Sequence, residues 1–238
     1  MQPITVIVPA AGVGRRLGLG KNKVFAAVGG LPLLVRCLRM LARTGLVRRA
    51  IVVTGATEQQ ETRQLLDAYR NRCFRDLETT VTAGGRERQD SVANGLALVP
   101  EKEGYVAVHD GARPFAGTEV FARTLALAER TGAAIAAVPV KDTVKVAGPN
   151  GFIAATPDRA TLWAAQTPQI FEVNLLRRAY ALLADRRTGD PPLTVTDDAS
   201  LVEALGHPVA LAEGSYDNIK ITTPEDLLLA EEIAKRSS

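Results

Sequence analysis

The 238-residue chain has few cysteines that could form disulfides or bind metal, and no long apolar segment that could enter a membrane. It contains two cysteines, Cys37 and Cys73, which are too few for a disulfide framework and lack metal-ligand spacing. It also lacks an apolar run of membrane-spanning length, and its first residues lead into a β-branched stretch instead of a secretory signal segment. These absences predict a soluble, cytoplasmic protein with reduced thiols and no membrane partner.

An excess of one charge is missing as well. There are 29 basic and 26 acidic residues, for a net charge of +3. This balance argues against a nucleic-acid-binding surface but leaves room for a local basic pocket. His109 and His207 are the only histidines, and neither stands in a plausible serine–histidine–acid context. Length and a hydrophobic content of 46% predict one globular domain over residues 1–238.

The first two-thirds of the chain alternate short β-branched runs with stretches that carry apolar residues at helical spacing. Such alternation predicts a Rossmann-like α/β fold, with a mostly parallel sheet, helices on both faces and ligands bound at the carboxyl ends of the strands. The expected strands are Ile4–Val8, Ala50–Thr54, Thr79–Thr82, Tyr105–His109 and Ala134–Pro139. Leu34, Leu38 and Leu41 indicate the first helix, which ends near Thr44-Gly45 and has Cys37 on its apolar side.

The regular alternation ends after Pro139. Residues 141–147 and 152–156 flank Gly148-Pro149-Asn150-Gly151, which predicts a projecting β-hairpin arm at about 140–157. A helix is expected from about Val173 to Ala184, followed by a mobile loop, Asp185–Leu193. A final helix should begin at Thr223-Pro224, with threonine as its N-cap and proline at its first position.

A glycine-containing segment, Pro9–Gly18, lies where the first strand must turn toward a helix. Its small residues allow close approach of the backbone to a phosphate, and Arg15, Arg16, Lys21 and Lys23 add positive charge. Two familiar phosphate motifs are excluded. The dinucleotide fingerprint requires glycine where Leu17 stands, and the P-loop requires serine or threonine where Asn22 stands.

Seven segments, taken together and in order, resemble the sugar-phosphate nucleotidyltransferases and most closely the 2-C-methyl-D-erythritol 4-phosphate cytidylyltransferase family. They span nearly the whole chain. One departure is visible, because family members commonly have proline where this chain has Asn22. The segments are Pro9–Gly18 with Lys23, Ala83–Val92, His109–Pro114, Val140–Lys145, Gln166–Gln169, Thr196–Ser200 and Asp217–Thr222.

The resemblance implies transfer of CMP from CTP to 2-C-methyl-D-erythritol 4-phosphate, with release of pyrophosphate, in non-mevalonate isoprenoid precursor synthesis. Two alternatives stay open at this stage. A cytidylyltransferase acting on ribitol 5-phosphate would need the same CTP half-site, so only the acceptor pocket separates the two. A regulatory nucleotide-binding module without activity is disfavoured, because Arg16, Lys23, Asp110 and Lys220 are all present.

The CTP-binding half-site is expected near the first turn and the ends of neighbouring strands. Arg16 and Lys23 are the candidates for stabilising charge on the α-phosphate and the leaving pyrophosphate. Gly84 and Gly85 would let backbone groups read the cytosine edge, with the hydroxyl of Ser91 beside them. The full set of expected CTP-binding residues is Ala10, Ala11, Gly12, Gly14, Lys23, Gly84, Gly85, Ser91, Asp110 and Lys220.

Asp110 ends an apolar strand and is the candidate ligand for Mg²⁺, directly or through water; it could also orient Arg113. The resemblance further implies that Arg159 and Lys220 position the acceptor phosphate, so the predicted catalytic residues are Arg16, Lys23, Arg159 and Lys220. The expected acceptor-binding residues are Arg113, Thr143, Arg159, Thr167 and Thr196.

An exposed hairpin is a liability unless something pairs with it. The resemblance implies a homodimer with interlocking arms, in which Thr143 and Arg159 serve the site of the other chain.

Overall fold

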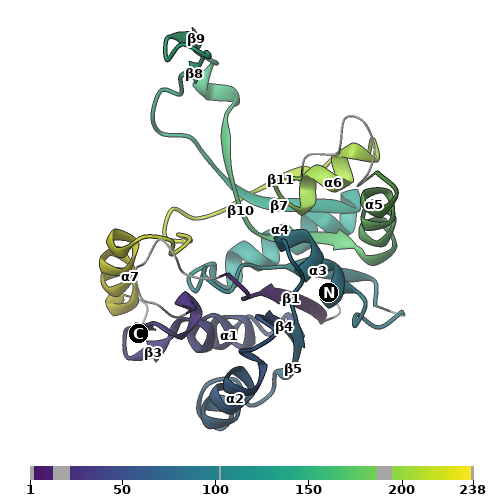
Figure 1. The fold of residues 1–238 in the computed structure, drawn as a ribbon, viewed down its shortest axis with the longest axis vertical. Helices are drawn as coiled ribbons and strands as arrows, with labels where there is room; N and C mark the ends of the chain where they lie inside the picture. The colour runs from purple at the N-terminus through teal and green to yellow at the C-terminus, as the bar shows by residue number, and fades with distance from the viewer. Residues whose placement is uncertain (1–2, 13–21, 102, 187–194, 237–238) are drawn as a thin grey trace.

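The computed structural model describes residues 3–12, 22–101, 103–186 and 195–236. A seven-stranded sheet, in the order β11-β7-β10-β6-β1-β4-β5, forms the centre of the molecule (Figure 1). All of its pairings are parallel except those of β10, so the expected mostly parallel α/β sheet is confirmed. The strands are β1 Ile4–Pro9, β4 Val47–Thr54, β5 Glu78–Ala83, β6 Tyr105–Val108, β7 Ala133–Pro139, β10 Trp163–Glu172 and β11 Ala210–Glu213.

Helices cover both faces of this sheet. One core joins α1, α2 and α4 to the side chains of Val6, Val8 and Val52. The other joins α3, α5 and α6 to Ile7 and Ile51, which alternate with the first set along the same strands. The helices are α1 Leu33–Arg43, α2 Gln59–Cys73, α3 Arg88–Leu96, α4 Gly117–Thr131, α5 Val173–Arg186, α6 Asp198–Ala204 and α7 Pro224–Arg236.

Short elements complete the described chain. A 3-10 turn, η2, covers Lys23–Phe25 and leads into a small hairpin of β2 (Ala27–Val28) and β3 (Leu31–Pro32). In the described residues, no helix combines the length and apolar character needed to cross a bilayer. The thiols of Cys37 and Cys73 are free, and Cys37 lies on the buried side of α1 as expected; a reducing compartment stays a prediction.

Both helices expected near the C-terminal end are confirmed. The helix expected from Val173 to Ala184 is α5. The final helix, α7, has Pro224 as its first residue. The Oδ2 atom of Asp226 accepts hydrogen bonds from the backbone N–H groups of Thr222 and Thr223, both at 2.8 Å, which fixes the start of α7. The loop expected at Asp185–Leu193 lies mostly outside the described residues.

Strand β10 was not expected from the sequence and it changes the topology. It lies between β6 and β7 and runs antiparallel to both. Its N-terminal half, beginning at Trp163, continues toward the arm, and its C-terminal half is buried in the sheet. The antiparallel return places Gln169 beside Val108 at the carboxyl end of β6, where a ligand site was expected, and beside Ile135 within β7.

The projecting arm is present (Figure 1). It ends in a hairpin of β8 (Val146–Ala147) and β9 (Ile153–Ala155), with Gly151 at a φ of 76° in the turn. These strands are shorter than the expected runs 141–147 and 152–156. Lys141 makes other contacts instead. Its ammonium lies over the Tyr216 ring, 3.5 Å from the ring centre, and the carbonyl of Lys141 accepts a hydrogen bond from Arg159.

Candidate functional site

A buried carboxylate forms the centre of the candidate site. Asp110 follows β6 at the carboxyl edge of the sheet, where strand–helix alternation predicts ligand binding. Its Oδ2 atom lies 2.8 Å from Lys220 Nζ and 3.7 Å from Arg113 Nε. Its Oδ1 atom lies 3.7 Å from Arg88 Nη2. Three cations therefore converge on one carboxylate, and two of them, Arg88 and Lys220, come from distant parts of the chain.

These cations decide the protonation state of Asp110. Burial alone would raise the pKa of its carboxyl group, but Lys220, Arg88 and Arg113 outweigh that effect and hold the pKa at about 2. Asp110 is therefore negatively charged at neutral pH. The site combines one fixed negative charge with several positive charges, which suits a polyanionic substrate.

Arg88, at the start of α3, joins Asp110 to a second buried acid. Its Nη2 atom lies 2.8 Å from Oδ2 of Asp198, whose side chain is fully buried. The Tyr180 hydroxyl donates a hydrogen bond to the other oxygen of Asp198 at 2.6 Å. No role for Arg88 was predicted from the sequence. Its position shortly after Gly84, beside the end of β5, is the signal that could have indicated one.

Two further side chains fix the turn that carries Asp110. The backbone N–H of Asp110 donates to Thr167 Oγ1 at 3.1 Å, and Thr167 Oγ1 lies 3.1 Å from His109 Nδ1. His109 Nε2 lies 2.8 Å from the Arg113 carbonyl oxygen, which can only accept, so Nε2 carries the ring hydrogen. The Thr167 hydroxyl then donates to Nδ1. His109 and Thr167 thereby hold the backbone of Asp110 from inside the fold.

The same arrangement requires an uncharged His109. Burial lowers the pKa of its imidazole to about 4, although the backbone bond to Arg113 and the charge of Asp110 act in the opposite direction. The unfolded chain takes up a proton near the ordinary value of about 6.5. Because the unfolded state gains this proton first, stability is expected to fall by about 3 kcal/mol as the pH drops from about 6.5 to about 4.

Urea unfolding measured across this pH range tests the expectation. His109→Gln should weaken the network at neutral pH but remove most of the pH dependence between about 6.5 and 4. Equal slopes for the wild type and His109→Gln would show that His109 is not the group responsible.

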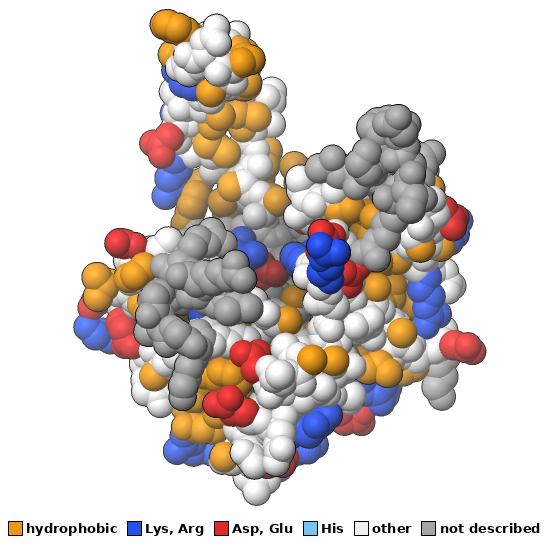
Figure 2. Space-filling model, viewed as in Figure 1, with side chains coloured by type: hydrophobic (Ala, Val, Ile, Leu, Met, Phe, Trp, Pro, Cys, Tyr) orange, Lys and Arg blue, Asp and Glu red, His pale blue; other side chains and the backbone are white. Residues whose placement is uncertain are grey.

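A cavity of about 450 Å³ opens beside this cluster. Figure 2 shows basic and acidic side chains gathered in the hollow at the base of the arm. Lys23, from η2, reaches across the cavity wall, and its Nζ atom donates to the Ile221 carbonyl at 2.8 Å, next to Lys220. The cavity is lined by Pro9, Ala10, Ala11, Gly12, Lys23, Val24, Gly85, Arg86, Glu87, Arg88, Ser91, Asp110, Ala112 and Lys220.

Gly84 and Gly85 allow the end of β5 to pack tightly against this cavity. A β-carbon at Gly84 would lie 2.7 Å from Ser91 Oγ and 3.0 Å from Ala11 Cβ, and one at Gly85 would collide with Asp90. The Ser91 hydroxyl accepts from the Gly85 N–H at 3.1 Å and lies 3.2 Å from the Glu87 carbonyl. The structure thus gives Ser91 a turn-stabilising contact beside the cavity.

Several expected acceptor-binding residues lie elsewhere. Thr167 is buried, and Arg113 donates to the Asn218 carbonyl at 2.7 Å behind the cavity wall. Thr196 is exposed just before α6, outside the residues that line the cavity. Thr143 and Arg159 are exposed on the arm. Gly14 and Arg16 lie outside the described residues.

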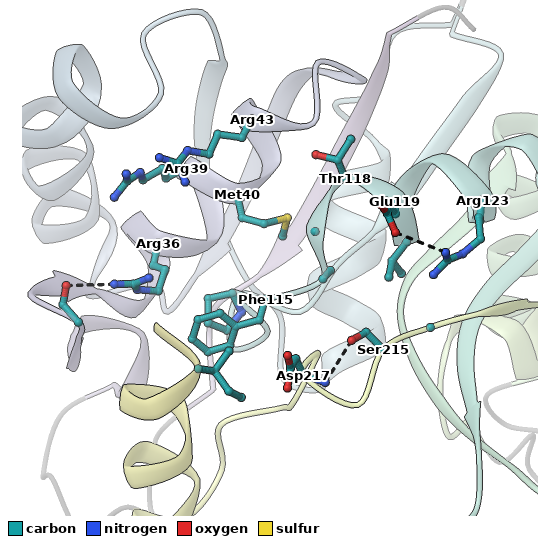
Figure 3. Close-up of a pocket in the computed structure, with 17 residues that line it drawn as sticks. Arg36, Arg39, Met40, Arg43, Phe115, Thr118, Glu119, Arg123, Ser215 and Asp217 are labelled. Carbon is teal, nitrogen blue, oxygen red and sulfur yellow. Dashed lines mark hydrogen bonds and ion pairs between the residues drawn. The ribbon is translucent and has the colours of Figure 1, made fainter. Parts of the chain in front are cut away.

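A larger cavity, of about 630 Å³, lies between α1, the start of α4 and residues 214–217 (Figure 3). None of the expected site residues lines it. Two of its arginines, Arg36 and Arg123, have structural contacts. Arg36 donates to the Val28 and Gly29 carbonyls and lies 5.8 Å from the Phe115 ring centre. Arg123 donates to the Glu213 carbonyl at 3.1 Å. The chemistry expected from the sequence therefore belongs to the cavity at Asp110.

A mostly parallel α/β sheet, with the small residues Ala10, Ala11 and Gly12 after β1 and a cation-rich cavity at the strand ends, is the arrangement of a nucleotidyltransferase. Comparison with known proteins supports this class and narrows it. The family described as "IspD: 2-C-methyl-D-erythritol 4-phosphate cytidylyltransferase" matches residues 4–236. The chain belongs to this family.

Individual relatives agree over nearly full length. The 2-C-methyl-D-erythritol 4-phosphate cytidylyltransferase of Bacillus velezensis is 43% identical over 234 residues, covering 98% of this chain and 96% of that protein. The protein of the same name from Syntrophotalea carbinolica is 46% identical over 231 residues, covering 96% and 94% of the two chains.

A crystal structure from Thermus thermophilus, also of a 2-C-methyl-D-erythritol 4-phosphate cytidylyltransferase, has a TM-score of 0.77 and 35% identity. It covers 98% of this chain and 100% of its own. That of the 4-diphosphocytidyl-2C-methyl-D-erythritol synthase from Anaerococcus prevotii has a TM-score of 0.83 and 30% identity, covering 99% of both chains.

Proposed function

We propose that the cavity at Asp110 is where this chain transfers a cytidylyl group from CTP to the phosphate of 2-C-methyl-D-erythritol 4-phosphate. The observation that carries the assignment to this cavity is the ionised Asp110 between Lys220 and Arg88, with the Lys23 ammonium bonded to the carbonyl of Ile221, next to Lys220. Family membership favours methylerythritol phosphate over ribitol 5-phosphate as acceptor. It also disfavours a regulatory module without activity.

The reaction requires little covalent chemistry from the protein. An oxygen of the acceptor phosphate forms a new bond to the α-phosphorus of CTP. The bond between that phosphorus and the bridging oxygen breaks, and its electron pair leaves with pyrophosphate. Catalysis of such an in-line transfer depends on positioning and on stabilising negative charge. The described cations that line the cavity are Lys23, Arg86, Arg88 and Lys220. Of these, Lys23 and Lys220 would stabilise the charge, and Arg16, outside the described residues, is a further candidate.

No general base is needed. A phosphate monoester, whose second pKa is near 6, is mostly dianionic at neutral pH and attacks as an anion. His109, the histidine nearest the site, has both ring nitrogens engaged and is fully buried, so it cannot reach a substrate. The role of His109 is to hold the Asp110 turn.

The residues present fit a magnesium ion held largely by the substrate. Among the described residues, no group of three histidines, cysteines or acids is placed to hold an ion by itself. Mg²⁺ commonly takes one or two protein carboxylates and fills its other positions with phosphate oxygens and water. Asp110 would supply that carboxylate, directly or through water, and the ion would neutralise charge on the phosphates of CTP.

We also propose that the arm pairs with the arm of a second chain. Val146, Phe152 and Ile153 are between 44% and 78% exposed on it, and Figure 2 shows apolar side chains along its length. Burial of such a surface is favourable and would cover the short edges of β8 and β9. In the resulting homodimer, Thr143 and Arg159, which do not line their own chain's cavity, would serve the cavity of the partner.

An assay of pyrophosphate release tests substrate choice. The proposed readout of cytosine uses fixed backbone groups near Gly84 and Gly85, and a purine is larger and presents a different edge. The kcat/KM with CTP should therefore exceed that with ATP or GTP by at least about 10²-fold. Methylerythritol phosphate should likewise exceed ribitol 5-phosphate. Comparable kcat/KM with ATP would contradict the cytidylyl assignment, and preference for ribitol phosphate would overturn the proposed acceptor.

A further inference from the structure

Asn22 is a buried polar residue immediately before Lys23. It is 4% exposed, although it begins a surface 3-10 turn. A buried amide is costly unless its hydrogen-bonding groups are paired, so its partners indicate what it does. They come from two other segments of the chain and from the turn itself.

The side-chain amide of Asn22 holds the end of β1 and the start of α2 together. Its Nδ2 atom donates to the Ala10 carbonyl at 2.6 Å and to Glu58 Oε2 at 2.8 Å. Its Oδ1 atom accepts from the Val24 N–H at 3.3 Å, which caps η2. One side chain therefore joins residue 10, residue 24 and residue 58, and it uses both amide hydrogens and the amide oxygen.

Glu58 is the second half of this contact. The same Oε2 atom lies 3.3 Å from Thr54 Oγ1 and 3.3 Å from the Gly55 backbone nitrogen, at the end of β4. Glu58 is thus attached to the carboxyl edge of the sheet. Hydrogen bonds to a carboxylate are shorter and stronger than those between neutral groups, so the Asn22–Glu58 contact should be a firm one.

The connection to the reaction runs through Lys23. Lys23 directly follows Asn22, the residue that the contact with Glu58 holds in place. The Nζ atom of Lys23 lies 2.8 Å from the Ile221 carbonyl on the cavity wall. Displacement of the backbone at residue 22 would move this ammonium relative to the phosphates. A misplacement of about 1 Å at a positioning group can cost about 10²-fold in rate.

We propose that Asn22 and Glu58 are positioning residues for Lys23 in the cytidylyl transfer, forming a clamp between the sheet edge and η2. This inference rests on the proposed location of the reaction at Asp110. It adds a pair of residues that touch no substrate and act only by placing Lys23. The backbone of Asn22 has φ −60° and ψ 127°, which proline also adopts, so proline would fix the backbone here without the clamp.

The first test is a double-mutant cycle. Asn22→Ala should lower kcat by about 10-fold to 100-fold, with a smaller change in the KM for the acceptor. In a Lys23→Ala background the same substitution should change kcat less than about 2-fold, because the group that Asn22 positions is gone. Equal losses of kcat in the two backgrounds, at temperatures well below both melting transitions, would overturn the proposal.

The second test uses Glu58 and separates a positioning role from general destabilisation. Glu58→Gln should lower kcat by about 3-fold to 10-fold in the wild type but should be nearly silent in Asn22→Pro, where the clamp no longer exists. Asn22→Pro itself should retain more activity than Asn22→Ala. If Glu58→Gln has the same effect on kcat with either residue at position 22, Glu58 does not act through Asn22 and the clamp is contradicted.

Failure of the Asn22–Glu58 clamp can be distinguished from failure of the proposed function. If the reaction does not take place at the Asp110 cavity, Lys23→Ala alone leaves kcat unchanged. If only the clamp is wrong, Lys23→Ala is impaired and the Asn22 effects add to it.

Discussion

Lys23→Ala is expected to lower kcat by about 10²–10³-fold while changing the KM for the acceptor much less. The ammonium lies on the cavity wall and donates to the Ile221 carbonyl, next to Lys220, where it can face charge that develops on the transferring and leaving phosphates. Such contacts strengthen in the transition state, so their loss reduces turnover more than ground-state binding. Steady-state kinetics with CTP and acceptor varied separately would measure both constants.

Lys235→Ala provides a matched control. Lys235 is an exposed lysine at the end of α7 that pairs with the neighbouring Glu232. Exposed pairs of this kind contribute little to stability, and Lys235 does not line the cavity. Its replacement should leave kcat within about 2-fold of the wild type. Wild-type turnover by Lys23→Ala would reduce Lys23 to a solvated surface cation.

Mixing two inactive variants should restore about a quarter of the wild-type activity if the proposed arm exchange is correct. Arg159 lies on the arm and bonds to the Lys141 carbonyl, while Lys23 lines the cavity of the main body. If Arg159 serves the partner's cavity, a heterodimer of Lys23→Ala and Arg159→Ala has one site with both lesions and one with none. Random pairing makes about half of the dimers heterodimers, which gives the expected quarter.

The subunits must be exchanged by joint unfolding and refolding, and the variants refolded separately serve as the control. If Arg159 acts on the cavity of its own chain, every site carries one lesion and the mixture is as inactive as its parents. A monomer by light scattering would exclude the shared site without affecting the assignment of the reaction.

The sequence predicts most strands of the sheet but not the antiparallel strand β10. Strands β1, β4, β5, β6 and β7 are β-branched or alanine-rich runs, and the structure has each within a few residues of its expected position. Strand β10 carries Gln166, Thr167 and Gln169 where an apolar run would be expected. Their partners are distant: Gln169 donates to Asp197 and accepts from the Asp198 N–H, and Gln166 donates to the Ser215 carbonyl. Local patterns cannot show that buried polar groups are satisfied from elsewhere.

The candidate site also contains some residues that the sequence predicts and others that it does not. The place of Asp110 follows from the end of an apolar strand, and the family resemblance indicates Lys220, far later in the chain. Arg88 was missed because a surface arginine is common and its partner Asp198 is far along the chain. The Thr167 hydroxyl was expected in the acceptor pocket, but it contacts His109 and the Asp110 backbone. The direction of a hydroxyl depends on tertiary packing, which spacing alone does not reveal.

Identification of the product that the purified chain forms from CTP and 2-C-methyl-D-erythritol 4-phosphate tests most directly whether the chain transfers a cytidylyl group to this acceptor. With Mg²⁺ present, we expect equal amounts of pyrophosphate and the cytidine diphosphate ester of methylerythritol. A chelator should abolish turnover, because the phosphates of CTP need a cation bridge. Hydrolysis of CTP to CMP, or no turnover by folded protein with Mg²⁺ and both substrates, would contradict the account.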